Sequence, residues 1–175
     1  MIVTQLGNPM NKPFRRLAFV ALLAFVLLCA NAADKLTVTI NKRSISAYCT
    51  VDLEAAKKEA AAAKKPIAWI ASSPKLLDDQ GSISQNSSRG ATLHALYALR
   101  DKCVFVFMDA YEENHKVLQL VDDALHTPDP HYTPPTVIFL DPDAKVVLAK
   151  VIYEPDFVKR ANALAKALDE IKGKF

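Results

Sequence analysis

Short apolar runs alternate with polar, helix-forming segments along most of this sequence. Runs at 66–71, 103–108 and 137–140, each bounded by turn residues, predict buried strands. Residues 36–40 and 44–49 alternate between apolar and polar types, which predicts either a strand pair or one bent strand at the start of the domain. The chain therefore begins with β-structure and returns to it several times.

Between these strands, apolar residues recur at helical spacing. Segment 51–65 has acids early and lysines late, which suits a helix dipole, and Thr50 is expected to cap it. Segments 89–100, 113–125 and 157–171 carry the same periodicity, and Gly173 is expected to end the last helix. Ser73 before Pro74 predicts one more helix start, followed by a loop at 80–88.

The other predicted elements can be placed around the segment 133–150. Pro134-Pro135 blocks regular pairing, 137–140 forms a strand, 141–144 turns, and 145–151 resumes an apolar run. This pattern predicts an antiparallel hairpin at a sheet edge, with its first strand the more central one. The whole order, β-α-β-α-β-α-β-β-α, predicts an α/β fold with a mostly parallel central sheet, helices on both faces and an antiparallel terminal hairpin.

The N-terminus has the organisation of a secretory signal peptide. Lys12, Arg15 and Arg16 precede an apolar run at 17–30, and Ala30-Asn31-Ala32 has small residues at the positions that define cleavage. We expect a signal peptide at 1–32 and a mature domain at 33–175, with export to the periplasm if the source is bacterial. A retained membrane anchor is the alternative, although fourteen apolar residues fall short of the ~20 that span a bilayer.

Charge narrows the choice of partners. The chain has 22 basic and 19 acidic residues, but three of the basic ones belong to the predicted leader, so the mature part is neutral. Neutrality gives no electrostatic reason to expect nucleic acid as a partner. Three cysteines, of which one lies in the leader, are too few for a disulfide-framework protein.

Three stretches resemble the thioredoxin family: KPIAWIAS at 65–72, the strand at 103–109 and PPTVIFLDPDAKVV at 134–147. The resemblance extends over about 48–171 and implies a thioredoxin-like fold. It also implies that Pro135 matches the family's cis-proline, which sits beside the redox site. We therefore expect the bond between Pro134 and Pro135 to be cis, which is inexpensive only before proline.

The redox chemistry of that family needs a C-x-x-C pair, and the corresponding turn at 71–75 reads Ala-Ser-Ser-Pro-Lys. Because serine hydroxyls cannot cycle through a disulfide, we expect no dithiol–disulfide exchange at this site. We interpret Ser73 as a helix cap rather than a nucleophile, since no G-x-S-x-G motif accompanies it. No cofactor is expected.

The resemblance implies a binding role instead. In redox-active relatives the corresponding surface grips an extended peptide, so we expect a protein or peptide partner at a surface made of Ser72, Ser73, Pro74, His131, Tyr132, Thr133, Pro134 and Pro135. His126, Asp129 and His131 could bind a metal ion, but nothing supplies a third and fourth ligand with certainty, so we interpret them as surface loop residues. His94 is interpreted as solvated or capping, and Trp69 as core.

The alternative to a binding role is an enzyme that depends on Cys49. It ends the opening strand, at the sheet edge where parallel-sheet proteins place their sites, so a thiol-dependent oxidoreductase or isomerase-like enzyme using Cys49 competes with the binding role. Burial as a small hydrophobic residue is the simpler interpretation. Cys49 ends one strand and Cys103 begins a parallel one, roughly six residues or ~20 Å away, so we expect no disulfide between them and a buried Cys103.

Overall fold

The computed structural model describes residues 35–40, 43–73, 87–111, 117–128 and 131–174, all of which belong to one unit that runs from Asp34 to Phe175. Several predictions fall outside these residues. They are the signal peptide at 1–32, Pro74 as both a helix start and a binding residue, most of the loop at 80–88, the first four residues of the helix at 113–125, and Asp129 of the candidate metal site.

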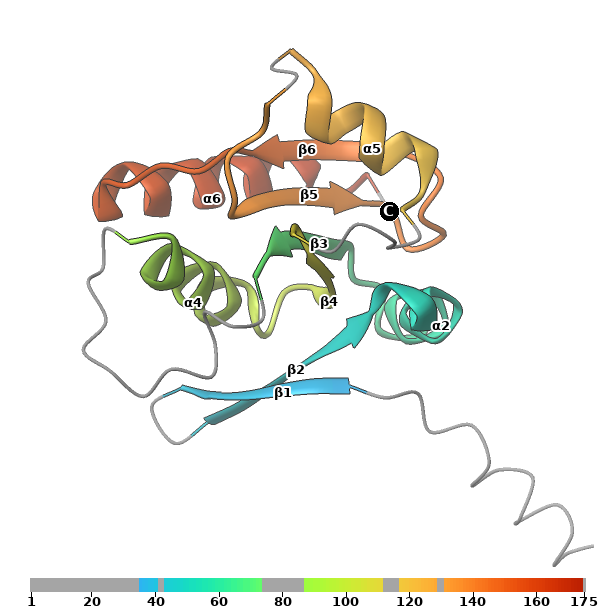
Figure 1. The fold of residues 1–175 in the computed structure, drawn as a ribbon. Coiled ribbons are helices and arrows are strands. Elements are labelled where there is room, and N and C mark those ends of the chain that lie inside the picture. The colour runs from blue at the N-terminus through green and yellow to red at the C-terminus, as the bar shows by residue number, and fades with distance from the viewer. Residues whose placement is uncertain (1–34, 41–42, 74–86, 112–116, 129–130, 175) are drawn as a thin grey trace, which may run out of the picture. The chain divides into compact units, whose positions relative to one another are not determined.

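Six strands form one sheet in the order β1-β2-β4-β3-β5-β6 (Figure 1). The strands are β1 (Lys35–Ile40), β2 (Arg43–Cys49), β3 (Ile67–Ser72), β4 (Val104–Asp109), β5 (Thr136–Leu140) and β6 (Val147–Val151). Strands β2, β4 and β3 are parallel, whereas β1 pairs antiparallel with β2, β5 with β3, and β6 with β5. The sheet is therefore mixed, and the prediction of a mostly parallel sheet was wrong, because the opening residues form a strand pair and β5 reverses direction against β3.

The terminal hairpin has the predicted arrangement. β5 lies inside the sheet and β6 at its edge. The turn between them is held by the carboxylate of Asp141, whose Oδ1 accepts from the backbone N–H groups of Lys145 at 2.6 Å and Val146 at 2.7 Å. Ala144 adopts a positive φ of 55° to close the turn.

The described helices are α2 (Leu53–Ala63), α4 (Ser88–Leu99), α5 (Gln119–His126) and α6 (Phe157–Ile171), with a short 3-10 turn, η1 (Thr50–Asp52), before α2. The prediction that Thr50 caps α2 was wrong, because Thr50 opens η1 and no side chain caps either element. Ser87 caps α4 through the N–H of Gly90, and Asp156 caps α6 through that of Lys159. Within the described residues, no helix combines the length and apolar character that crossing a bilayer requires.

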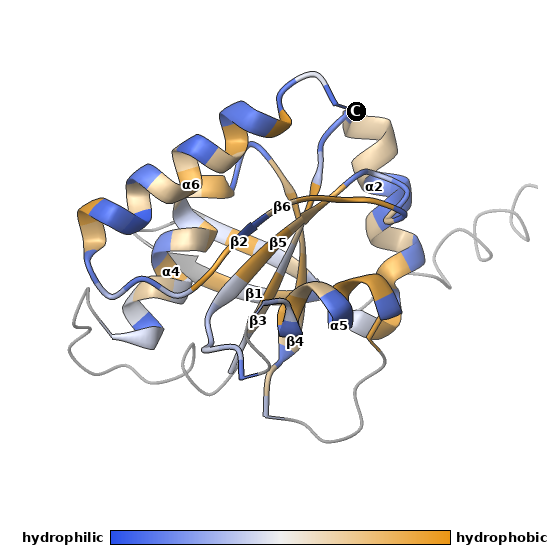
Figure 2. Cartoon of the chain, turned by 90° about the horizontal axis from the view of Figure 1, so that it is seen from above, coloured by the Kyte–Doolittle hydropathy of each residue, from blue (hydrophilic) through white to orange (hydrophobic). Residues whose placement is uncertain are grey.

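The helices cover both faces of the sheet. Buried residues of α4 and α6 join Ala68, Ile70, Phe105 and Phe139 in one cluster. Alternation along the strands turns Trp69, Val106 and Ile138 to the opposite face, which α2 and α5 cover. Figure 2 shows the hydrophobic strands between helices whose polar sides face outward. β3 is buried along its whole length, and Trp69 is a core residue as predicted.

His94 belongs to the contact between α4 and α6, so its interpretation as a solvated or capping residue was wrong. The buried Arg160 of α6 donates from Nε to Nδ1 of His94 at 3.1 Å. The His94 ring also packs against that of Phe157, with 4.4 Å between the centroids. Burial, and after it the charge of Arg160, lowers the pKa of His94. Sequence periodicity missed this contact because an arginine was not expected on the buried face of α6.

Candidate binding site

The carboxyl end of β3 meets the loop that precedes β5. Ser72, the last residue of β3, pairs with Asp109 of β4, and its neighbour Ala71 pairs with Thr136, the first residue of β5. The residues just before Thr136 therefore lie next to the end of β3. The peptide bond between Pro134 and Pro135 is cis. Thr136 closes this turn by donating from Oγ1 to the carbonyl oxygen of Thr133 at 3.1 Å.

Ser72 forms a buried hydrogen bond at the end of β3. Its side chain is fully buried, and its Oγ lies 2.7 Å from Oγ1 of Thr92 on α4. Since Thr92 gives its own proton to the carbonyl oxygen of Ser88, Ser72 is the donor in the pair. The hydroxyl of Ser72 is thus engaged and offers no surface to a partner. The neighbouring Ser73 is 8% exposed.

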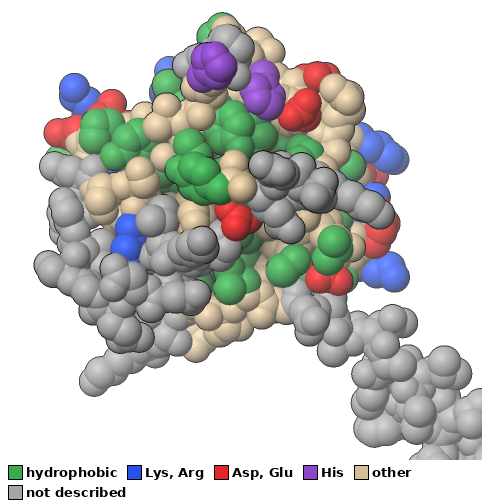
Figure 3. All heavy atoms as spheres, viewed as in Figure 1, with side chains coloured by type: hydrophobic (Ala, Val, Ile, Leu, Met, Phe, Trp, Pro, Cys, Tyr) green, Lys and Arg blue, Asp and Glu red, His purple; other side chains and the backbone are tan. Residues whose placement is uncertain are grey.

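The residues of the loop differ in how far they are exposed to solvent. His131 and Thr133 are exposed, Tyr132 and Pro134 are half-buried, and Pro135 is buried. Tyr132 stands edge-on to the ring of His126 at the end of α5, with 5.5 Å between the centroids. Figure 3 shows histidine side chains at this end of the molecule, beside hydrophobic and acidic ones.

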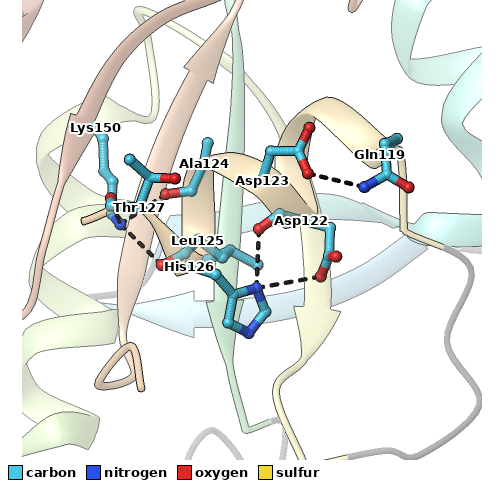
Figure 4. Close-up of polar contacts among 8 residues, drawn as sticks. All are labelled: Gln119, Asp122, Asp123, Ala124, Leu125, His126, Thr127 and Lys150. Atoms are coloured by element: carbon cyan, nitrogen blue, oxygen red, sulfur yellow. Dashed lines mark hydrogen bonds and ion pairs between the residues drawn. The ribbon is translucent and has the colours of Figure 1, made fainter. Parts of the chain in front are cut away.

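Lys150 fixes the start of this loop from the edge strand. Its ammonium group donates to the carbonyl oxygens of Ala124 at 2.7 Å, Leu125 at 2.9 Å and Thr127 at 3.0 Å (Figure 4). A cation at the last turn of a helix also interacts favourably with the helix dipole. The sequence analysis did not single out Lys150, although a lone lysine inside the apolar run of β6 was a signal that it had a partner.

The candidate metal ligands are brought together only in part. Nδ1 of His126 lies 2.9 Å from the backbone oxygen of Asp122 and 3.4 Å from its Oδ1, so this nitrogen is already engaged (Figure 4). Asp129 lies outside the described residues. Among the residues that are described, no three histidine, cysteine or acidic side chains are grouped as a metal ion would require.

Cys49 and Cys103 are both free thiols, as expected. Cys49 pairs with Phe107, four positions beyond Cys103, so the two are about 13 Å apart along the strands rather than ~20 Å. Even this shorter separation exceeds the ~7 Å that a disulfide allows. Burial raises the pKa of Cys103 to about 12. Cys49 is half-buried, and β4 lies between its strand and β3, so the structure does not bring Cys49 into the loop surface.

Two acidic residues and a second tyrosine, which the sequence analysis missed, interact electrostatically with Tyr132. The pKa of Tyr132 is raised by burial first, and then by Tyr111, Asp122 and Asp109. Asp109 ends β4, and its Oδ1 accepts from the backbone N–H of Tyr111 at 3.0 Å. The ring of Tyr111 is 70% exposed. An acid directly after a buried strand was the available signal.

Two cavities lie away from this loop. One, of about 520 Å³, lies beside the first hairpin and α2 and is lined by residues that include Lys35, Glu59 and Cys103. The other, of about 380 Å³, runs between β6 and α6. Neither is lined by any residue of the loop. Charged side chains contribute to the lining of both cavities, whereas small-molecule pockets are lined mainly by apolar ones.

No protein-family model matches the sequence, and the search of curated proteins also finds no match.

Proposed function

We propose that this chain is an exported, thioredoxin-like domain that has no dithiol site and acts by binding an extended segment of a protein or peptide partner. The α/β arrangement supports the proposal: three parallel strands are followed by an antiparallel hairpin, and helices cover both faces. The proposal takes its fold family from the resemblance at 65–72, 103–109 and 134–147.

The observation that carries the binding role is the contact between the end of β3 and the loop 131–135. The loop lies where β3 ends, yet the residues there are serines, and the hydroxyl of Ser72 is committed to Thr92. The mature sequence has no cysteine between Cys49 and Cys103, so this place has no thiol to oxidise. A surface with exposed polar side chains and half-buried Tyr132 and Pro134 remains. Such a surface can hold a partner but cannot exchange disulfides with it.

The enzyme that uses Cys49 is less well supported. Cys49 lies on β2, on the far side of β4 from the loop, so a substrate held by the loop would not reach its thiol directly.

Site-specific photo-crosslinking in the source cells tests the binding role. A photoreactive p-benzoylphenylalanine replaces Thr133, which is exposed on the loop, or Val158, which is 63% exposed on α6 and serves as the control. We expect discrete crosslinked partners from position 133 that are absent from position 158. Equal products from both positions, or none from position 133, would contradict a partner at this loop.

A further inference from the structure

The sheet has two edge strands, β1 and β6, and they differ in how they are protected against pairing with another chain. An edge strand leaves a row of backbone N–H and C=O groups without partners, and natural sheets protect such edges with bulges, lysines or prolines. The pairing of β6 with β5 shifts its register between Phe139 and Leu140, β6 contains Lys150, and Pro155 follows the strand. β6 is therefore a protected edge.

The other edge strand, β1, lacks a bulge and a proline. Its register with β2 continues without a break from Lys35 to Ile40, and its sequence, KLTVTI, is rich in β-branched residues. β1 stands last in the strand order, and Figure 1 shows it at the margin of the sheet. No described strand pairs with its outer side, so β1 can accept one more strand.

The two faces of β1 differ in polarity. Leu36 and Val38 are half-buried and pack against the core cluster on the side of α4 and α6. Thr37 is exposed on the opposite side, where its Oγ1 lies 3.3 Å from Oγ of Ser46. Because side chains alternate between the two faces of a sheet, an added strand fits only when its apolar residues lie on the side of Leu36 and its polar residues on the other.

The sequence of β1 meets this requirement with its own copy. In an antiparallel pair of two β1 strands about a twofold axis that passes through Val38, perpendicular to the sheet, each face continues into the same face of the second copy. Leu36 then stands opposite Ile40 of the other strand, and Thr37 opposite Thr39. Apolar positions are thus paired with apolar ones and threonines with threonines, which are favourable cross-strand pairs.

Charge favours the same register. Lys35 is the one charged residue of β1, and its Nζ donates to Oε2 of Glu59 at 2.7 Å and lies 4.1 Å from the centroid of the Tyr48 ring. With the axis at Val38, the two copies of Lys35 are six residues apart along the strands, or about 20 Å, which is well beyond the Debye length of about 8 Å. An axis at Leu36 would reduce that separation to about 7 Å.

We propose that β1 is a dimerisation edge, at which a second copy of this chain adds its own β1 antiparallel and joins two six-stranded sheets into one. A single strand pair makes a small interface, so we expect a reversible dimer with a dissociation constant of about 10 µM. Three strands separate β1 from β5 and the loop before it, so dimerisation leaves the loop 131–135 accessible. The inference is independent of the proposed binding role.

Sedimentation velocity over a range of concentrations tests the dimer. The protein begins at Ala33 and so keeps the whole unit from Asp34 to Phe175. The variant Thr37→Lys places one more ammonium group from each copy close to the axis, and it should raise the dissociation constant at least about tenfold. Val146→Lys is the matched control, because it adds the same charge at a 53% exposed position beside β6, and it should leave the dissociation constant unchanged. Circular dichroism checks that both variants are folded.

Disulfide trapping tests the register. In a Cys49→Ala/Cys103→Ala background, Val38→Cys places a thiol on the axis, where directly opposed Cα atoms lie about 4.5–5.5 Å apart and a disulfide can form. Mild oxidation should therefore link two copies through position 38, and Val146→Cys should give no such product. A monomer at every concentration up to about 200 µM would overturn the proposal. So would a dimer that Thr37→Lys leaves unchanged, or one that is trapped through position 146 and not through position 38.

Discussion

Replacing Lys150 by methionine should destabilise the end of α5 and the start of the loop that leads to the candidate site. Methionine keeps an unbranched stem of similar length but removes the ammonium group that donates to the carbonyl oxygens of Ala124, Leu125 and Thr127. These carbonyls belong to the last turn of α5 and to the residue that follows it. The change therefore leaves the helix end and the start of the loop without their common donor.

The size of the effect follows from the number and exposure of these bonds. A hydrogen bond to a charged group contributes about 1.5–3 kcal/mol when it is well buried. Since the site is only partly buried and water can replace some of the bonds, we expect a loss of about 2 kcal/mol in total, including the interaction with the helix dipole. For a domain of this size, that loss lowers the melting temperature by roughly 6 °C.

Urea and thermal unfolding of Lys150→Met measure this loss, with Lys166→Met as the matched control. Lys166 lies on α6, its side chain is 78% exposed, and its Nζ lies 3.7 Å from Oε1 of Glu170, so its removal should cost less than about 0.5 kcal/mol. Amide exchange should also speed up at 126–135 in Lys150→Met alone. If both variants unfold at the same urea concentration, Lys150 does not hold the helix end, and the reasoning fails.

Three further predictions concern the other contacts of the fold. Because the folded-state pKa of His94 lies below its ordinary value of 6.5, the unfolded chain takes up the proton first. His94 should thus leave the free energy of unfolding unchanged above about pH 6.5 and lower it as the pH drops below that value. In urea titrations, the free energy of unfolding of His94→Gln should fall less between about pH 7.5 and 5.5 than that of the unchanged protein. Ser72→Ala and Thr92→Val should each cost about 1 kcal/mol, and the double variant less than their sum, because they share one buried hydrogen bond; additive losses would argue against the bond. When the mature protein is unfolded and alkylated without reductant, mass spectrometry should find two added alkyl groups, and the protein should not reduce insulin above a no-protein control. A disulfide found by alkylation would show that the cysteine assignment is wrong. Insulin reduction that survives replacement of Cys49 and Cys103 would show the same.

Sequence patterns were sufficient for the elements whose periodicity is strong. The buried strands β3, β4 and β5 appear as bounded apolar runs, and the turn at Asp141 follows from proline and aspartate chemistry. The strand directions were harder to predict, because a run of apolar residues shows that a strand is buried but not which way it runs beside its neighbours. The antiparallel pairing of β5 with β3 was missed for that reason.

The sequence pointed to the loop before β5 but not to the charged residues that contact its surroundings. The loop 131–135 was found through its prolines, which restrict the backbone locally and so leave a mark in the sequence. Lys150 was missed because its role depends on contacts between segments that are far apart in the chain. The buried Arg160 was missed because a helical pattern read from apolar residues has no place for a charged one on its inner face.

The central claim is that a peptide binds at the loop 131–135 beside the end of β3. Amide chemical shifts of isotope-labelled protein that begins at Ala33, titrated with a peptide from the partner that is crosslinked at position 133, test it most directly. We predict that the shifted resonances cluster at 71–73, 109–111 and 131–136, where the register brings the strand ends and the loop together. Shifts that gather instead at the groove between β6 and α6, or at the cavity beside α2, would contradict the account and place the partner elsewhere.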